Sequence, residues 1–179
     1  MAETEKKHLG IVEALFVDDV SAFLQERGES APAALRWLNE QHQKYKLMEQ
    51  GLMQKRRRLR GQMPDIEHSL KIIHYMQQKQ KDGDKNIESH FMLSDNVFAS
   101  ASLSLTNSVC LWLGANVMME YSVDAAIQLL EKNLTQARSS LNSLDSHLGF
   151  LRDQITTTEV TIARVYNWDV KRRQATTRT

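Results

Sequence analysis

The sequence predicts a mainly α protein with a small β part, in which a long antiparallel two-helix coiled coil is joined by two β-hairpins. Three observations lead to this prediction. Two stretches of roughly 50 residues repeat apolar side chains with a period of seven. The segment between them switches to β-branched, aromatic and small residues. The chain of 179 residues has only two prolines and seven glycines, so few residues interrupt a helix.

We expect five regions along the chain. Residues 1–31 form a lead that is partly disordered or a short helix. Residues 32–85 and 122–172 form the two helices of the coiled coil, and residues 86–121 form two β-hairpins for assembly. Residues 173–179 form a disordered tail.

The second helix has the clearer heptad pattern. Ten of the twelve positions in its two heptad columns are large and apolar, which is typical of a coiled-coil seam. Ser122 is the expected N-cap, and Asp124 suits the positive end of the helix dipole. The columns are Ile127, Leu134, Leu141, Leu148, Ile155 and Ile162, and, three residues on, Leu130, Ala137, Leu144, Leu151, Thr158 and Val165.

The first helix follows the same period less strictly. Its other heptad column contains the polar residues His42, Glu49 and Arg56, which we expect to loosen this half of the seam. Pro64 predicts a kink, and Gly83 is placed to end the helix. Its apolar column is Leu38, Tyr45, Leu52, Leu59, Ile66 and Ile73.

The lead contains apolar residues at a helical spacing. They favour docking of the lead on the coil over binding to another polypeptide, although both interpretations fit the pattern. These residues are Leu9, Val12, Phe16, Val20 and Phe23.

The middle segment favours a chain that folds back on itself over the alternative, a parallel homodimeric rod. We predict strands at Ser89–Leu93, Val97–Leu103, Val109–Leu113 and Val117–Tyr121, with a tight turn at residues 114–116. Short hairpins are marginal alone and expose unpaired edges, so these strands are expected to pair with strands of other subunits. The residues assigned to assembly are Val97, Phe98, Val109, Leu111, Leu113, Val117 and Met119.

An antiparallel coil places the start of the first helix beside the end of the second. Trp37, Tyr166 and Trp168 lie outside the heptad columns there and could form an exposed patch that binds apolar segments of unfolded chains. The alternative is that these rings cover the end of their own coil. The predicted patch consists of Leu35, Trp37, Leu38, Tyr45, Ile162, Val165, Tyr166 and Trp168.

Composition and motifs argue against several other functions. The chain has 23 Lys and Arg against 22 Asp and Glu, whereas nucleic-acid binding favours a basic excess. The run from Arg56 to Arg58 therefore fits a solvated helix face or a docking surface better than nucleic-acid binding or nuclear import. We find no catalytic, cofactor-binding or metal-binding motif, so we expect no enzyme and no cofactor.

The location of the protein follows from weaker signals. The single cysteine, Cys110, cannot form an internal disulfide and is expected to be buried and inert in a strand. The first ten residues lack the apolar core of a signal peptide, and no run of about 18 apolar residues is present. We therefore expect a cytoplasmic protein, with the nucleus as a second compartment, that binds no membrane.

The order of helix, two hairpins and helix resembles the alpha-type subunits of prefoldin, since beta-type subunits have one hairpin. The resemblance covers nearly the whole chain. It is most specific in the hairpin with the sequence LGANV and in the ending YNWDVKRR. Within the family, the segments that resemble the third-subunit group of eukaryotic prefoldins are residues 8–24, 39–66 and 150–173.

The resemblance implies a hexamer of two alpha-type and four beta-type subunits. In such a complex the hairpins form a shared β-barrel body, from which six coiled coils project. It implies a co-chaperone that holds unfolded actin and tubulin and delivers them to the cytosolic chaperonin without ATP. The alternative that we keep is a structural or tethering coiled-coil protein without chaperone activity.

Overall fold

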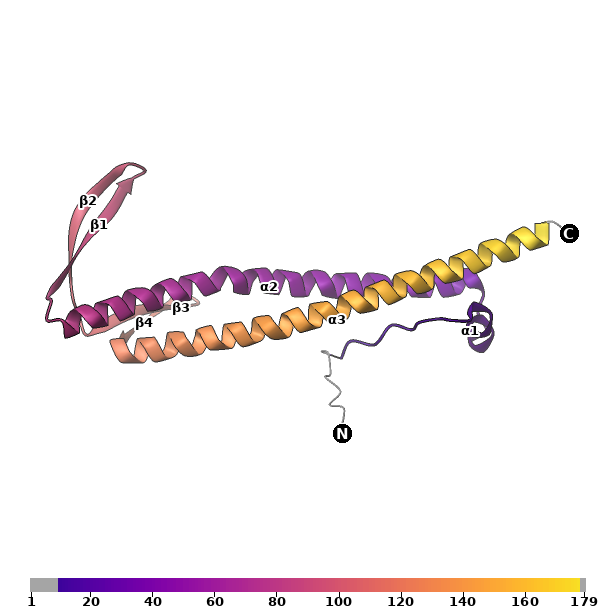
Figure 1. The fold of residues 1–179 in the computed structure, drawn as a ribbon, viewed down its shortest axis with the longest axis horizontal. Coiled ribbons are helices and arrows are strands. Elements are labelled where there is room, and N and C mark those ends of the chain that lie inside the picture. Colours follow the sequence, from indigo (N-terminus) through magenta and orange to yellow (C-terminus); the bar gives the residue numbers. More distant parts are fainter. Residues whose placement is uncertain (1–9, 178–179) are drawn as a thin grey trace, which may run out of the picture. The chain divides into compact units, whose positions relative to one another are not determined.

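The computed structural model describes residues 10–177, and these fall into two compact units. Unit 1 consists of Met1–Arg58 and Leu141–Thr179, and unit 2 of Leu59–Ser140. The predicted fold class is confirmed, because long helices flank two hairpins (Figure 1). The elements are α1 (Val20–Arg27), α2 (Ala31–Lys81), β1 (Asn86–Ser94), β2 (Val97–Ser104), β3 (Ser108–Gly114), β4 (Val117–Ser122) and α3 (Val123–Thr177).

Helix α2 ends where the sequence places a glycine. Gly83 has a left-handed φ of 85°. Its N–H donates to the carbonyl of Gln80 at 3.2 Å, and the N–H of Asp84 donates to the carbonyl of Lys79 at 3.1 Å. This pair of bonds is a Schellman motif, which satisfies the last carbonyls of the helix. The helix therefore stops at Lys81, just before the glycine predicted to end it, within the predicted region 32–85. It continues through Pro64, and the kink there stays a prediction.

Helix α3 begins at the predicted cap but extends beyond its predicted end. The Oγ of Ser122 accepts the N–H of Ala125 at 3.4 Å, and Asp124 lies in the first turn. The prediction of a disordered tail is wrong for residues 173–177, which are helical. The buried carboxylate of Asp169 pairs with Arg173 at 2.9 Å and with Arg172 at 3.7 Å, and such pairs stabilise the last turns. Residues 178–179 lie outside the described part.

Within each unit, a segment of α2 packs against a segment of α3. The apolar heptad residues face this contact, as their spacing requires, and all twelve predicted seam residues are buried or half-buried. In unit 1 they are Leu52, Leu141, Leu144, Leu148, Leu151 and Ile155; in unit 2 they are Leu59, Ile66, Ile73, Ile127, Leu130 and Leu134.

The polar heptad residues of α2 all have partners. His42 contacts the carboxylate of Glu159 at 2.9 Å, and Arg56 pairs with Asp145 at 2.6 Å. Glu49 pairs at 3.5 Å with a lysine of its own helix, Lys46. Two of these three pairs link α2 to α3, so they oppose the loosening that we predicted for this half of the seam.

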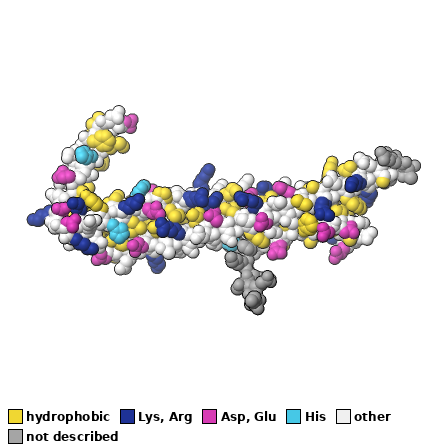
Figure 2. Space-filling model, viewed as in Figure 1, with side chains coloured by type: hydrophobic (Ala, Val, Ile, Leu, Met, Phe, Trp, Pro, Cys, Tyr) yellow, Lys and Arg dark blue, Asp and Glu magenta, His cyan; other side chains and the backbone are white. Residues whose placement is uncertain are grey.

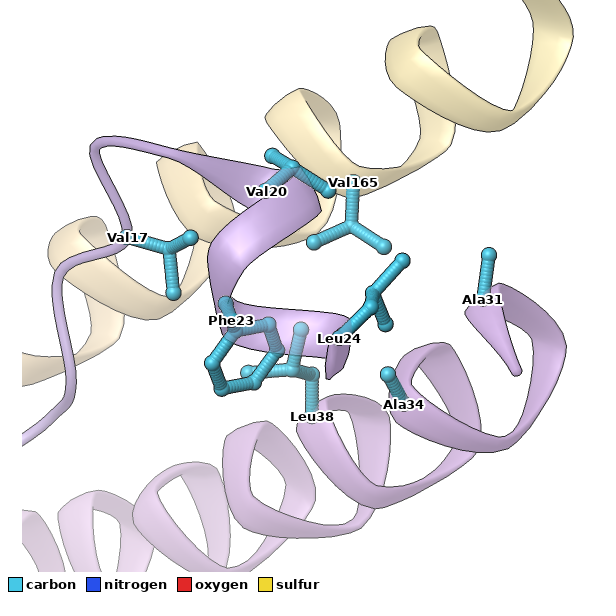
Figure 3. Packing of buried hydrophobic residues seen from close by; sticks show 8 residues of the cluster. All are labelled: Val17, Val20, Phe23, Leu24, Ala31, Ala34, Leu38 and Val165. Carbon is cyan, nitrogen blue, oxygen red and sulfur yellow. The ribbon is translucent and has the colours of Figure 1, made fainter. Parts of the chain in front are cut away.

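The described part of the lead docks on the helices, in agreement with the favoured prediction (Figure 3). Helix α1 is capped by Asp19, whose Oδ1 accepts the N–H of Ser21 at 2.8 Å, and it ends at Gly28 with a φ of 61°. The buried residues of α1 and the preceding segment pack against the start of α2 and the end of α3. The cluster consists of Val17, Val20, Phe23, Leu24, Ala31, Ala34, Leu38 and Val165.

The helical spacing predicted for the lead is wrong before residue 20. Residues 11–19 are neither helix nor strand, and their inward-facing positions recur every third residue, at Ile11, Ala14 and Val17. Val12 and Phe16, which were expected to pack, are exposed. Leu9 lies outside the described residues.

Each hairpin is an antiparallel pair of strands. In the β3–β4 hairpin, Leu111 faces Met119 and Trp112 faces Met118. The connecting residues Ala115 and Asn116 have φ values of 49° and 61°, which is the conformation of a type I′ turn. In the β1–β2 hairpin, Met92 faces Phe98, and both ladders have an irregularity beside the turn.

Candidate functional site

The two hairpins form a largely uncovered apolar surface, which we call the assembly surface. Monomeric soluble proteins rarely expose large contiguous apolar patches. Hydrophobic side chains lie along the β1–β2 hairpin in Figure 2. Eleven large ones of the two hairpins are exposed: Phe91, Met92, Leu93, Val97, Phe98, Leu103, Trp112, Leu113, Val117, Met118 and Met119.

The two faces of the β3–β4 hairpin have different surroundings. Val109, Leu111 and Tyr121 pack on the unit 2 cluster that contains Leu70 and Ile127. Because successive side chains of a strand alternate between faces, Cys110 and Trp112 lie on the opposite face. Trp112 is 60 % exposed, and its cross-strand partner Met118 is also exposed. The outer face therefore carries an aromatic–methionine pair that nothing covers in the described part of the chain.

The predicted assembly residues differ in exposure, and their contact with other subunits stays a prediction. Val109 and Leu111 are half-buried against their own helices, whereas Val97, Phe98, Leu113, Val117 and Met119 are exposed. Six exposed side chains of the hairpins were not in the predicted set: Phe91, Met92, Leu93, Leu103, Trp112 and Met118. Strand alternation could have placed Trp112 and Met118 on one face, but it does not show that this face is the exposed one.

Cys110 is exposed, so its predicted burial is wrong. The cause is the same alternation, which places its side chain on the outer face with Trp112 rather than on the helices.

Each strand also has one open edge. The described chain contains two separate two-stranded sheets, β1–β2 and β3–β4, so every strand has one edge without a ladder partner. Such edges are templates for pairing with further strands. Apolar faces and open edges together suit insertion into a larger β structure.

Six of the eight residues of the predicted patch gather in unit 1 around one cluster. Leu38 and Val165 are buried in it, and Leu35, Trp37, Ile162 and Trp168 pack against it. Tyr45 is buried in a neighbouring cluster, and Tyr166 is 54 % exposed outside both. An exposed patch in this conformation therefore excludes Leu38, Tyr45 and Val165.

Cations of the lead and of α3 lie over the two tryptophans of the predicted patch. The guanidinium of Arg27 in α1 lies 4.1 Å from the ring centroid of Trp37. Arg172 lies 5.3 Å from the ring of Trp168. The two tryptophans are thus half-buried and engaged by cations of their own chain.

An extended part of the lead, residues 11–18, lies in a groove of unit 1. We call these residues the strap, and we call the groove the strap groove. The side chains of Tyr45 in α2 and of Gln154, Thr161 and Arg164 in α3 bond to the strap backbone. A cavity of about 60 Å³ remains beside the strap, lined in part by Trp37 and Thr158. Burial raises the pKa of the Tyr45 phenol, because the charged form is poorly solvated there.

The basic run on α2 is mostly solvent-facing. Lys55, Arg57, Arg58 and Arg60 are exposed, and only Arg56 has an ion-pair partner in α3. Within residues 10–177 no cluster of three His, Cys, Asp or Glu side chains could hold a metal ion. In that same range, none of the helices has the length and apolar character that crossing a membrane requires.

Comparisons with known proteins identify the family. A family model described as Prefoldin subunit matches residues 45–168. Prefoldin subunit 3 of Mus musculus is 57 % identical over 167 residues, which cover 93 % of this chain and 85 % of the mouse protein. The Drosophila melanogaster prefoldin subunit 3 is 44 % identical over 180 residues, covering 100 % of this chain and 91 % of the fly protein.

A more distant relative and a solved structure agree. The Saccharomyces cerevisiae prefoldin subunit 3 is 36 % identical over 179 residues, covering 96 % of this chain and 89 % of the yeast protein. A filamentous prefoldin (PFD) from Methanocaldococcus jannaschii shares the fold at 15 % identity, with a TM-score of 0.51 over 66 % of this chain and 94 % of that one. The predicted resemblance to the third-subunit group is confirmed, and the chain belongs to the prefoldin subunit family, whose members are co-chaperones that form complexes with other prefoldin subunits.

Proposed function

We propose that the chain is an alpha-type subunit of a cytoplasmic heterohexameric prefoldin. In this complex it joins one other alpha-type and four beta-type subunits. The complex captures unfolded polypeptides, nascent actin and tubulin among them, and delivers them to the cytosolic chaperonin without ATP. The chain supplies two hairpins to the shared β body and one coiled coil to the client-binding part.

The observation that carries this proposal is the assembly surface. Its exposed apolar side chains and open strand edges would favour aggregation of a free chain, and pairing with other subunits removes both problems. The tethering alternative requires a chain that folds or dimerises alone. The assembly surface weighs against it.

The proposed mechanism needs no nucleotide. Holding an unfolded chain requires apolar surface and polar groups that can bond a polypeptide backbone. In unit 1, Tyr166 is exposed, and the half-buried rings of Trp37 and Trp168 lie around the docked lead. Weak contacts of this kind allow a client to leave for the chaperonin.

Client holding can be tested with the reconstituted complex. Chemically unfolded actin is diluted into buffer without ATP, and light scattering reports its aggregation. We expect suppression by the complete complex and none by the other five subunits alone. Adding purified chaperonin should then transfer labelled actin, as followed by native gel electrophoresis.

Two results would contradict the proposal. One is aggregation that proceeds equally with and without the complete complex. The other is suppression that requires ATP. A complex with Leu47→Ala on α2 is the control for an arbitrary substitution at an exposed apolar position. It should suppress aggregation as the wild-type complex does, because Leu47 belongs to no core cluster in the described structure.

A further inference from the structure

The strap is held by hydrogen bonds to its backbone and by side-chain contacts, among them Arg164, which lies 5.2 Å from the ring of Phe16 and 3.7 Å from the carboxylate of Asp18. The hydroxyl of Tyr45 donates to the carbonyl of Val12 at 2.9 Å, and that of Thr161 donates to the carbonyl of Leu15 at 3.0 Å. Two further bonds complete the set. The N–H of Ala14 donates to the Gln154 Oε1 at 2.7 Å, and the Arg164 guanidinium donates to the carbonyl of Asp18 at 3.0 Å.

The strap side chains contribute in a simple pattern. Ile11, Ala14 and Val17 turn inward, whereas Val12, Leu15 and Phe16 are exposed. A period of three is that of a polyproline II chain, which has no internal hydrogen bonds and therefore offers its backbone groups to a partner. The groove thus selects an extended chain with small or medium aliphatic residues at every third position.

The groove also contains polar side chains that a coiled coil does not need. Gln154, Thr158 and Thr161 are buried on α3, and a buried polar group without a partner is costly. Thr158 bonds within its own helix, but Gln154 and Thr161 bond to the strap. Every polypeptide has the same N–H and C=O groups, so these two side chains can bond another extended chain whose inward-facing side chains fit the groove.

We propose that the strap groove is a binding site for extended polypeptide, and that residues 11–18 are its tethered occupant. This inference rests on the proposed function, since the external occupant is a segment of an unfolded client. The strap competes through its high effective concentration, so a client enters when the strap leaves. A cavity of about 60 Å³ lies between strap residues 12–15 and the side chains of Trp37, Tyr45 and Thr158.

The test uses complete complexes and a labelled peptide with the sequence of residues 10–19. One complex carries the chain without residues 1–18, which keeps the Asp19 cap of α1. A second complex carries the full-length chain with Ile11→Asp, Ala14→Asp and Val17→Asp. This chain keeps its full length but places charges at the three inward-facing positions of the strap, and it replaces the shortened chain if that chain fails to assemble. Fluorescence anisotropy should show that the peptide binds at least about tenfold more tightly to each variant complex than to the wild-type complex, because the tethered strap no longer competes for the groove.

If the groove recognises the peptide backbone, removing one hydrogen bond to that backbone should weaken peptide binding. In the strap-free complex, Thr161→Val should weaken peptide binding about fivefold, the effect of one lost hydrogen bond. The matched control is Thr156→Val, because Thr156 is on the same helix and its hydroxyl bonds only to the carbonyl of Arg152 in the described structure. A peptide that is N-methylated at the Ala14 position should lose affinity similarly.

Several outcomes would overturn the inference. No peptide binding to either strap-free complex refutes the site, and equal binding to the wild-type complex refutes the competition. Equal effects of Thr161→Val and Thr156→Val refute backbone recognition. The actin assay separates the two proposals: a complex that suppresses aggregation but binds no peptide keeps its proposed function without this groove. A complex that binds the peptide but does not suppress actin aggregation supports the groove as a peptide-binding site and contradicts the proposed function.

Discussion

At the scale of single residues, the packing of unit 1 depends on side chains that are completely enclosed. Leu151 is 0 % exposed and packs with Tyr45 and Ile155. Leu151→Ala should lower the opening free energy of nearby α3 amides by about 2–5 kcal/mol, because it leaves a cavity. Native-state hydrogen exchange of the assembled complex measures this value.

The matched control for that prediction is Leu47→Ala. Leu47 is also a helical leucine of unit 1, but it is 71 % exposed. Its truncation should change the opening free energy by less than about 0.5 kcal/mol. Equal losses for the two variants would contradict the assignment of the core.

The stability that Tyr45 contributes by holding the strap should depend on pH in the alkaline range. Burial raises the pKa of its phenol above the usual value of about 10, so the fold favours the neutral form, which donates to the Val12 carbonyl. The corresponding stability is complete below the unfolded pKa and is lost as pH rises through the folded pKa. The gap in melting temperature between wild type and Tyr45→Phe should therefore be constant near neutral pH and change only above about pH 10. A gap that already changes between pH 6 and 8 would refute this role.

The sequence predicted the burial of single residues correctly where the heptad period alone determines which side chains face inward. The heptad columns identified Leu148, Leu151 and Ile155 as inward-facing, and all three are buried. The predicted patch was less accurate, since Leu38 and Val165 belong to the same columns and are buried with the lead. Spacing alone does not show that a distant segment covers a surface.

At the scale of elements, the β3–β4 turn holds an alanine in a conformation that favours glycine. Ala115 has a φ of 49°, where a residue with a Cβ is strained by about 1–2 kcal/mol. Ala115→Gly should therefore stabilise the hairpin by about 0.5–1 kcal/mol, since glycine adopts this conformation readily but is more flexible when unfolded. Hydrogen exchange of the β3 and β4 amides in the complex measures the change.

The opposite sign is expected for the same substitution inside a strand. Ala101 lies within β2 and faces Ser89 across the ladder, so Ala101→Gly should weaken its hairpin. Destabilisation of the turn by Ala115→Gly would show that the type I′ geometry is wrong.

The elements themselves were largely predictable because strong local signals mark them. The heptads define both long helices, Ser122 and Gly83 mark two of their ends, and the four strands lie within a few residues of their predicted positions. The strap was not predictable, because its three-residue period occurs in an extended chain and resembles a helical spacing. The last turns of α3 depend on Asp169, whose ion pairs with two arginines the composition does not reveal.

At the scale of the whole molecule, the chain is incomplete without partners. Its two hairpins expose apolar faces, and each strand has an open edge. The sequence predicted this assembly role from the shortness of the hairpins and their unpaired strand edges. It did not show which face is outermost, because alternation assigns side chains to two faces without saying which one meets the helices.

The central claim is that the assembly surface inserts into a heterohexamer. Trp112→Glu places a charge on its outer face, whereas the control Tyr166→Glu places the same charge on an exposed aromatic of unit 1 outside the hairpins. Burying an unpaired carboxylate between subunits is strongly unfavourable. Only the Trp112 variant should therefore lose the ability to assemble.

Native mass spectrometry of each chain mixed with the other five prefoldin subunits tests this claim most directly. We predict that the wild type and Tyr166→Glu appear as one copy in a defined hexamer and that Trp112→Glu is excluded from it. A wild-type chain that remains a stable monomer or homodimer in the presence of those partners would contradict the account.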